Sequence, residues 1–114
     1  MGNQTFLVEV GQDVKLQCWD EADPPKRVAL KILSQPSAPI TLRFRNINVN
    51  TNSSYVLNDD FSVTIPDVQI SDRGEYRCDS VSTEGVDKRF PATVNVYSKY
   101  IHCIMIQHNN RIQT

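Results

Sequence analysis

The chain has few of the residues on which catalysis, metal binding and nucleic-acid binding depend. Its 114 residues include only 2 histidines, 3 cysteines and 1 tryptophan. The 12 basic and 13 acidic residues leave a formal net charge of -1, which excludes the overall basic field that draws a protein to nucleic acid or to anionic lipid. The cysteines are too few for a disulfide-dense miniprotein.

Long apolar runs are also missing. None approaches the roughly 20 residues that span a bilayer, and the N-terminal residues MGNQTFLVEV lack the apolar core of a signal peptide. If the parent protein is secreted or membrane-bound, we expect those segments to lie outside this sequence.

Histidine is confined to the C-terminal tail, as His102 and His108. An enzyme needs a nucleophile, a base and a stabilising group that converge, and the adjacent pair His102 and Cys103 does not supply them because neighbouring residues of an extended chain point to opposite faces. The same residues lack the usual spacing of zinc ligands. The sequence therefore predicts no enzyme activity, no metal site and no cofactor.

The rest of the composition is that of one folded domain, with 39% hydrophobic and 22% charged residues. Apolar and polar residues alternate with period two between turn residues, and no segment keeps a period of 3.6. This pattern predicts an all-β fold whose antiparallel sheets each have one buried and one exposed face. The expected strands cover residues 5–10, 13–18, 27–33, 40–45, 54–57, 60–65, 74–80 and 89–97.

Two of the cysteines fall on the inward faces of their strands. By the alternation, Cys18 shares a face with Leu16, and Cys78 shares a face with Tyr76. A bridge between Cys18 and Cys78 is therefore geometrically reasonable, and closing a loop of about 60 residues stabilises a domain by about 4 kcal/mol in the chain-entropy model. Cys103 is left over, either as a crosslink between two chains or as an incidental residue of the tail.

The run DRGEYRC, residues 72–78, has a tyrosine two residues before the second cysteine, where an immunoglobulin sandwich has its tyrosine corner. Together with VKLQC, which ends at Cys18, and FSVTI at residues 61–65, this motif resembles the immunoglobulin superfamily over residues 5–97. The resemblance implies a two-sheet antiparallel Greek-key sandwich with one disulfide between the sheets. The core motif residues that it implies are Leu30, Asp72, Gly74 and Tyr76.

The stretch from residue 34 to residue 53 leaves room for the extra C′ and C″ strands of a variable-type or intermediate-type domain. Two departures from that pattern matter. Leu30 stands where the family usually has a tryptophan on strand C, and residues 89–93 lack the Phe-Gly-x-Gly bulge of antigen receptors. The resemblance therefore favours a germline-encoded cell-surface protein. Trp19 either points outward as an interface anchor or fills the core in place of the missing strand-C tryptophan.

Members of the family often bind through the sheet of strands G, F, C and C′. If Leu30, Phe44 and Cys78 point inward, the intervening cations point outward and form a basic stripe that suits an acidic partner. The alternative is that these are ordinary solvated positions. Residues 81–89 are the expected F–G loop. The candidate ligand-binding residues are Lys31, Arg43, Arg45, Arg77, Glu84 and Lys88.

Asn3 and Asn52 each begin an N-glycosylation acceptor pattern. We expect residues 1–97 to form the domain, and residues 98–114 to be a stalk remnant, an extra strand or a segment foreign to the natural protein. The resulting hypothesis is an extracellular recognition domain of a membrane-anchored immune receptor or co-receptor that binds a protein ligand. The alternatives are an adhesion module that forms homodimers or packs in cis, and a secreted binder of glycans or pathogen surfaces.

Overall fold

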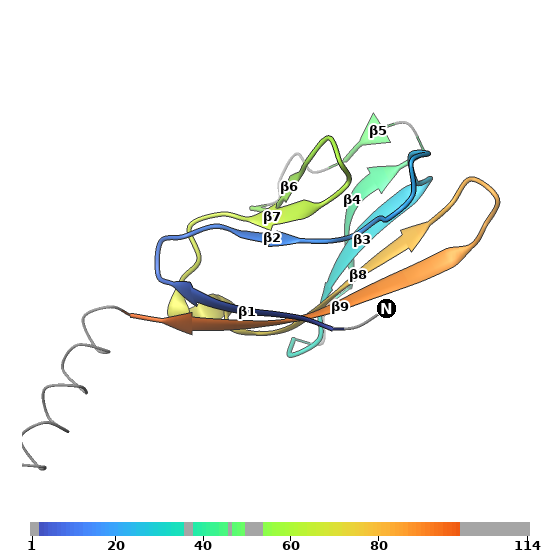
Figure 1. The fold of residues 1–114 in the computed structure, drawn as a ribbon. Coiled ribbons are helices and arrows are strands. Elements are labelled where there is room, and N and C mark those ends of the chain that lie inside the picture. Colours follow the sequence, from blue (N-terminus) through green and yellow to red (C-terminus); the bar gives the residue numbers. More distant parts are fainter. Residues whose placement is uncertain (1–2, 36–37, 46, 50–53, 99–114) are drawn as a thin grey trace, which may run out of the picture.

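The computed structural model describes residues 3–35, 38–45, 47–49 and 54–98 (Figure 1). Asn52, the two histidines and Cys103 lie outside these residues. Among the described residues, no helix has the length and apolar character that crossing a membrane requires. The elements are β1 (Gln4–Glu9), β2 (Val14–Leu16), β3 (Arg27–Ile32), β4 (Ile40–Phe44), β5 (Ile47–Asn48), β6 (Val56–Leu57), β7 (Val63–Ile65), the 3₁₀ helix η1 (Ile70–Asp72), β8 (Gly74–Val81) and β9 (Asp87–Tyr97).

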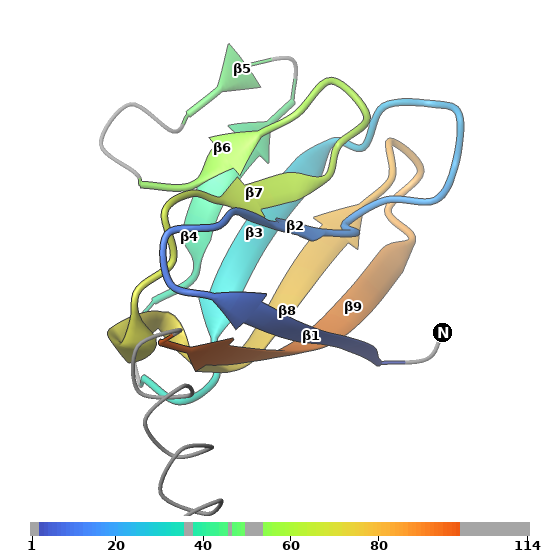
Figure 2. The same ribbon diagram turned by 60° about the vertical axis from the view of Figure 1, so that its left-hand side comes forward.

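The strands form two sheets that face each other (Figure 2). One is six-stranded, in the order β1-β9-β8-β3-β4-β5, and the other is three-stranded, in the order β2-β7-β6. All neighbouring strands are antiparallel except β1, which lies parallel to β9. The predicted all-β sandwich is confirmed. The short strand β5 adds an edge within the stretch that left room for an extra strand.

The core lies between the sheets and is built from alternate residues of the strands. Cys18 and Cys78 are joined by a disulfide that links β8 to the segment after β2, with 5.3 Å between their Cα atoms, so the predicted pairing is confirmed. Leu30 is fully buried and pairs with Cys78 across β3 and β8. A leucine therefore packs beside the disulfide, at the position where the family usually has a tryptophan. The buried cluster contains Val14, Leu16, Cys18, Val28, Leu30, Leu42, Val63, Ile65, Val68, Tyr76, Cys78, Phe90, Ala92 and Val94.

The predicted tyrosine corner is present at the start of β8. The Tyr76 hydroxyl donates a hydrogen bond to the backbone oxygen of Asp72, at the end of η1. The Asp72 carboxylate in turn accepts a hydrogen bond from the backbone N–H of Gln69 at 2.8 Å, which closes the turn. Gly74 has φ +143°, and a Cβ there would lie 3.0 Å from the Ser34 hydroxyl oxygen, so the position favours glycine on two grounds.

The expected direction of Arg43 and Phe44 is wrong, and a β-bulge is the reason. Val28 pairs with Arg43, whereas Ala29 pairs with Thr41, so β4 has one extra residue, Leu42, opposite β3. An extra residue reverses which side chains face the core beyond it. Arg43 therefore lies on the side of the buried Val28, and Phe44 points outward with 45% of its surface exposed.

Phe61 also departs from simple alternation, which predicts that it shares a buried face with Val63 and Ile65. Phe61 has φ +64° and precedes β7 in a turn closed by its own N–H, which donates to the Asn58 oxygen at 2.9 Å. The left-handed backbone changes the parity, so that Ser62 is buried instead. The Phe61 ring lies 5.2 Å from the guanidinium carbon of Arg43.

Tyr76 makes the domain sensitive to alkaline pH. Burial raises the pKa of its phenol, and the nearby Tyr55 and Asp72 raise it further. The folded state therefore holds this proton above the ordinary pKa of about 10, so its contribution to stability is complete below pH 10 and falls as the pH rises beyond it. We expect Tyr76→Phe to lower the free energy of unfolding by about 1 kcal/mol at pH 8.

The same variant should lose less stability than the parent between pH 8 and pH 10.5, because it has no phenol to titrate. Urea unfolding of both proteins at the two pH values measures this difference. An equal loss in the two proteins would show that folding does not raise the pKa of the Tyr76 phenol.

Candidate functional site

None of the described elements covers the outer face of the six-stranded sheet (Figures 1 and 2). Cross-strand partners share a face, so the strand register arranges its side chains in rows. The loop-end row consists of Asp87, Val81, Arg27, Phe44 and Ile47, from β9 to β5. The middle row consists of Arg89, Asp79, Ala29 and Thr41. The far row consists of Pro91, Arg77 and Lys31.

Two of the predicted stripe residues, Lys31 and Arg77, lie side by side in the far row. Arg77 is largely occupied within the chain, because its Nε and one terminal nitrogen donate to the two carboxylate oxygens of Asp79 at 2.7 and 3.0 Å. This bidentate contact raises the pKa of the Arg77 guanidinium. The far row therefore presents less free positive charge than the sequence alone suggests.

An apolar and cationic corner lies at the other end of the face, where β3, β4 and β5 meet the loop-end row. Phe44 and Ile47 are 45% and 65% exposed, and they pair across β4 and β5. The Arg45 guanidinium carbon lies 5.2 Å from the centre of the Phe44 ring, within the range of a cation–π contact. Arg27 pairs with Phe44 on the other side. Such a combination of exposed apolar and arginine side chains is typical of protein-binding surfaces.

Ala29 makes a shallow hollow in the middle of the face. Its short side chain is flanked by longer ones, which enclose a space of about 130 Å³. The charged side chains around this hollow are of both signs, with Arg27 and Arg89 on one hand and Asp79 and Asp87 on the other. The face therefore offers a recess and a mixed electrostatic pattern.

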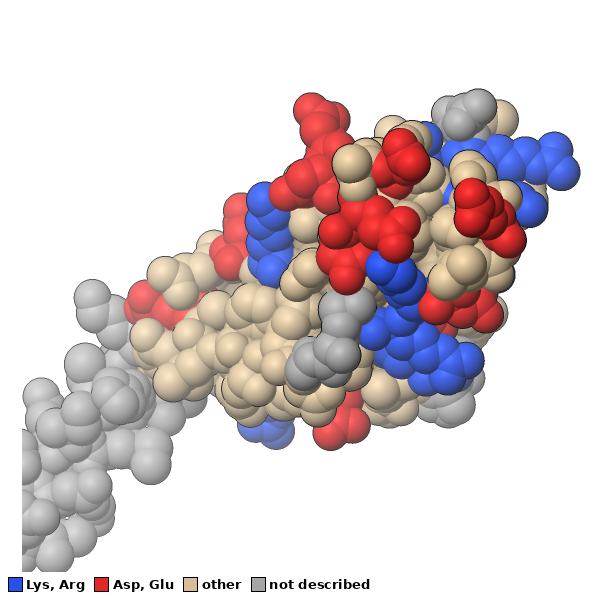
Figure 3. Space-filling model, turned by 45° about the vertical axis from the view of Figure 1, so that its right-hand side comes forward, with Lys and Arg blue, Asp and Glu red and all other residues tan. Residues whose placement is uncertain are grey.

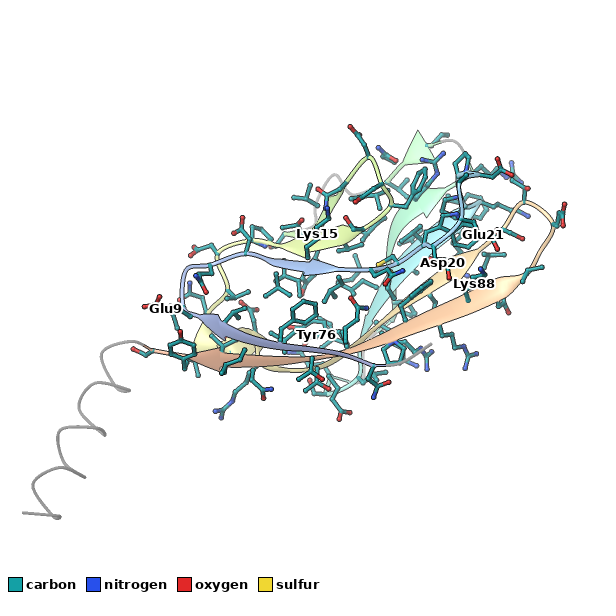
Figure 4. The ribbon with its side chains drawn as sticks, viewed as in Figure 1. Glu9, Lys15, Asp20, Glu21, Tyr76 and Lys88 are labelled. Carbon is teal, nitrogen blue, oxygen red and sulfur yellow. A yellow bond between two sulfur atoms is a disulfide. The ribbon has the colours of Figure 1, made fainter. Side chains whose placement is uncertain are left out.

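Lys88, at the start of β9, lies beside Asp20 and Glu21 of the loop before β3 (Figure 4). Trp19 is only 6% exposed, and its Nε1–H donates to the Asp23 backbone oxygen at 2.5 Å. The Lys88 ammonium lies 5.4 Å from the centre of the Trp19 ring and 2.7 Å from carboxylate oxygens of both Asp20 and Glu21. Its hydrogen bonds to the two carboxylates raise its pKa. Trp19 is thus an inward-facing residue at the end of the sandwich, and Lys88 is used within the chain.

The turn between β8 and β9 is held by its own hydrogen bonds. The Ser82 hydroxyl accepts from the backbone N–H groups of Glu84 and Val86 at 3.2 and 3.0 Å, and Gly85 adopts φ +86°. Glu84 and Val86 are exposed at the tip. Charged side chains of both signs gather at this end of the molecule (Figure 3).

The predicted site residues therefore do not all lie together on one surface. Lys31 and Arg77 share the far row, Arg45 lies at the corner, Glu84 lies at the loop tip, and Arg43 and Lys88 are directed toward other parts of the chain. The alternation in the sequence did not predict that Arg27, Phe44 and Ile47 share the outer face, because the bulge in β4 reverses the direction of Phe44. Asn3 is exposed, as a glycosylation site requires. Among the described residues, no group of three or more potential ligands is placed to hold a metal ion.

The model of the immunoglobulin V-set domain matches residues 2–97. The chain belongs to the immunoglobulin V-set domain family. V-set domains are non-enzymatic, and those with the inter-sheet disulfide are typically extracellular and mediate protein binding. In the terms of this family, the outer face described above is the face of strands G, F, C, C′ and C″, which are β9, β8, β3, β4 and β5.

Solved structures of similar fold include Ig domains of cell-surface proteins. The first Ig-like domain of human CD48 antigen has a TM-score of 0.62 at 15% identity and covers 85% of this chain and 84% of its own. Dpr11 IG1, solved bound to DIP-gamma, has a TM-score of 0.55 at 18% identity, with coverage of 84% and 100%. The RIG-5 IG1 homodimer has a TM-score of 0.58 at 25% identity, with coverage of 82% and 90%. A search of curated protein sequences finds no significant match.

Proposed function

We propose that this V-set domain is the extracellular recognition domain of a cell-surface immune receptor or co-receptor, and that it binds a protein ligand through the outer face of its six-stranded sheet. The observation that carries this proposal is the corner of Phe44, Ile47 and Arg45, which leaves apolar and cationic groups exposed together. Neighbours in the comparisons are a domain bound to another immunoglobulin protein and a homodimer, which supports protein recognition as the task.

We further propose that the domain ends near Tyr97, where β9 ends and the family match stops, and that the parent protein is membrane-anchored. Glycans on Asn3 and Asn52 remain predictions. Self-association is the second candidate function, because the RIG-5 neighbour is a homodimer.

The test is a fluorescent tetramer of the full chain, applied to an array of purified extracellular domains. We expect Phe44→Ala and Arg27→Ala each to weaken binding at least about tenfold, because anchors of this kind dominate interface energies. Val56→Ala is the matched control. The exposed fraction of Val56, 46%, is similar to that of Phe44, but Val56 belongs to β6 of the other sheet.

The control should bind as the parent does. Binding that tolerates both changes on the outer face, or that is lost in Val56→Ala, would place the ligand site elsewhere and overturn the proposal.

A further inference from the structure

Four cations gather where β3 begins and β4 ends, and they are Lys26, Arg27, Arg43 and Arg45. The strand register pairs Arg27 with Phe44. At the next position along the two strands, the Arg45 backbone N–H donates to the Lys26 backbone oxygen at 2.5 Å. Because paired strands lie about 4.8 Å apart, the four residues occupy one small part of the surface. We call this set of residues the basic corner.

The charge of the basic corner is not neutralised by ion pairs. All 13 acidic residues of the chain lie in its described part, and none of them is in an ion pair with any of the four cations. Arg43 and Arg45 instead have their guanidinium carbons 5.2 Å from the ring centres of Phe61 and Phe44. An aromatic ring attracts a cation but carries no opposite charge. The corner therefore keeps its positive field for another molecule.

A hollow of about 350 Å³ lies within the corner. It is lined by Pro24, Pro25, Lys26, Arg45 and Thr83. Lysine and arginine side chains donate hydrogen bonds and cannot accept them, and a threonine hydroxyl can donate as well. No acidic residue of the described chain lines this hollow. Such a set of donors around two positive charges suits an oxyanion.

The acidic side chains of the loop end line a separate hollow of about 140 Å³, and these are Glu21, Asp23 and Glu84. Pro24 and Thr83 line both hollows, so the acidic one adjoins the basic one. A negatively charged chain is repelled on the acidic side. When it is bound at the basic corner, it therefore runs away from Glu84 and toward Arg43 on β4.

We propose that the basic corner binds a sulfated glycosaminoglycan chain, with one sulfate group in the hollow between Lys26 and Arg45. This inference goes beyond the proposed function, because it adds a polysaccharide to the protein ligand. V-set domains with this disulfide are typically extracellular, and sulfated polysaccharides are the main polyanions outside cells. A linear polyanion also matches four neighbouring cations better than a single anionic group does, since every contact with it releases bound counterions.

The formal net charge of -1 does not oppose such binding. At a salt concentration of about 0.1 M, exposed charges more than about 10 Å apart are largely screened from each other. The distant acidic residues therefore contribute little at the basic corner, and the local charge determines the attraction.

The test measures the dissociation constant of the full chain for a heparin oligosaccharide by isothermal titration calorimetry, at about 50 mM and about 200 mM salt. We expect Lys26→Gln and Arg45→Gln each to weaken binding about threefold, and the double variant about tenfold, because exposed charge contacts are individually modest. The dependence of log Kd on log salt concentration should become shallower by about one for each cation removed.

Two further variants give the test its controls. Arg73→Gln makes the same change of charge at an exposed residue that follows η1, at the opposite end of β8 from the basic corner, and it should bind as the parent does. Glu84→Gln removes a repelling charge and should strengthen binding. It leaves the turn intact, because the Ser82 hydroxyl accepts from the backbone N–H of Glu84. Circular dichroism of each variant checks the fold.

An absence of heparin binding at the lower salt concentration would overturn the inference, and so would equal losses in Lys26→Gln and Arg73→Gln. Hyaluronan, which has carboxylates but no sulfates, is the second probe, and binding as tight as that of heparin would contradict the assignment to sulfate. Each of these failures leaves the proposed function standing if Phe44→Ala still loses binding to a protein of the array. Heparin binding together with no protein ligand would support the inference and overturn the proposed function.

Discussion

Replacing both bridge cysteines, as Cys18→Ala with Cys78→Ala, should lower the free energy of unfolding by about 4 kcal/mol. The bridge spans 60 positions, and in the chain-entropy model a crosslink of that length removes a large amount of disorder from the unfolded chain. Since small domains are stable by only about 5–15 kcal/mol, this is a large share of the total. Urea unfolding of the purified proteins at neutral pH measures it.

Cys103→Ser is the matched control, because it removes a cysteine without touching the bridge. We expect its unfolding curve to coincide with that of the parent under non-reducing conditions. Adding a reductant should shift the parent toward the double variant and leave the double variant unchanged. A double variant that unfolds at the same urea concentration as the parent would show that the bridge adds nothing to stability.

Trp19→Ala should cost about 3 kcal/mol, the lower end of the range for removing a buried aromatic side chain. Trp19 is 6% exposed and packs at the loop end of the sandwich, where its ring also lies beside the Lys88 ammonium. The cavity that remains leaves the segment with Asp20 and Glu21 without its support. Thermal unfolding followed by circular dichroism measures the loss.

Trp19→Phe separates the contribution of packing from that of the hydrogen bond. It keeps most of the apolar volume and loses the Nε1–H bond to Asp23, so we expect a cost nearer to 1 kcal/mol. The parent's single tryptophan should also fluoresce as a shielded indole. If Trp19→Ala is no less stable than Trp19→Phe, the ring does not pack as described.

The alternation of apolar and polar residues and the DRGEYRC motif were sufficient to predict the sandwich and its disulfide. Alternation places Val14, Leu16 and Cys18 on one face, and the burial of all three follows it. The tyrosine corner has its signal in the spacing between Tyr76 and Cys78. Where alternation failed, one residue had changed the parity. Leu42 did so through a bulge, and Phe61 through a left-handed backbone.

The sequence by itself indicated the two-sheet fold and the pairing of Cys18 with Cys78, because the alternation places both cysteines inward and the DRGEYRC motif resembles the tyrosine corner of the family. Only the tertiary structure decided which residues share the outer face. The reason is that the bulge, the strand register and the ion pairs of Lys88 depend on neighbours distant in the sequence, and that the register decides which side chains lie beside Arg77. They turn Phe44 outward, bring Arg27 beside it, and occupy Arg77 and Lys88 within the chain.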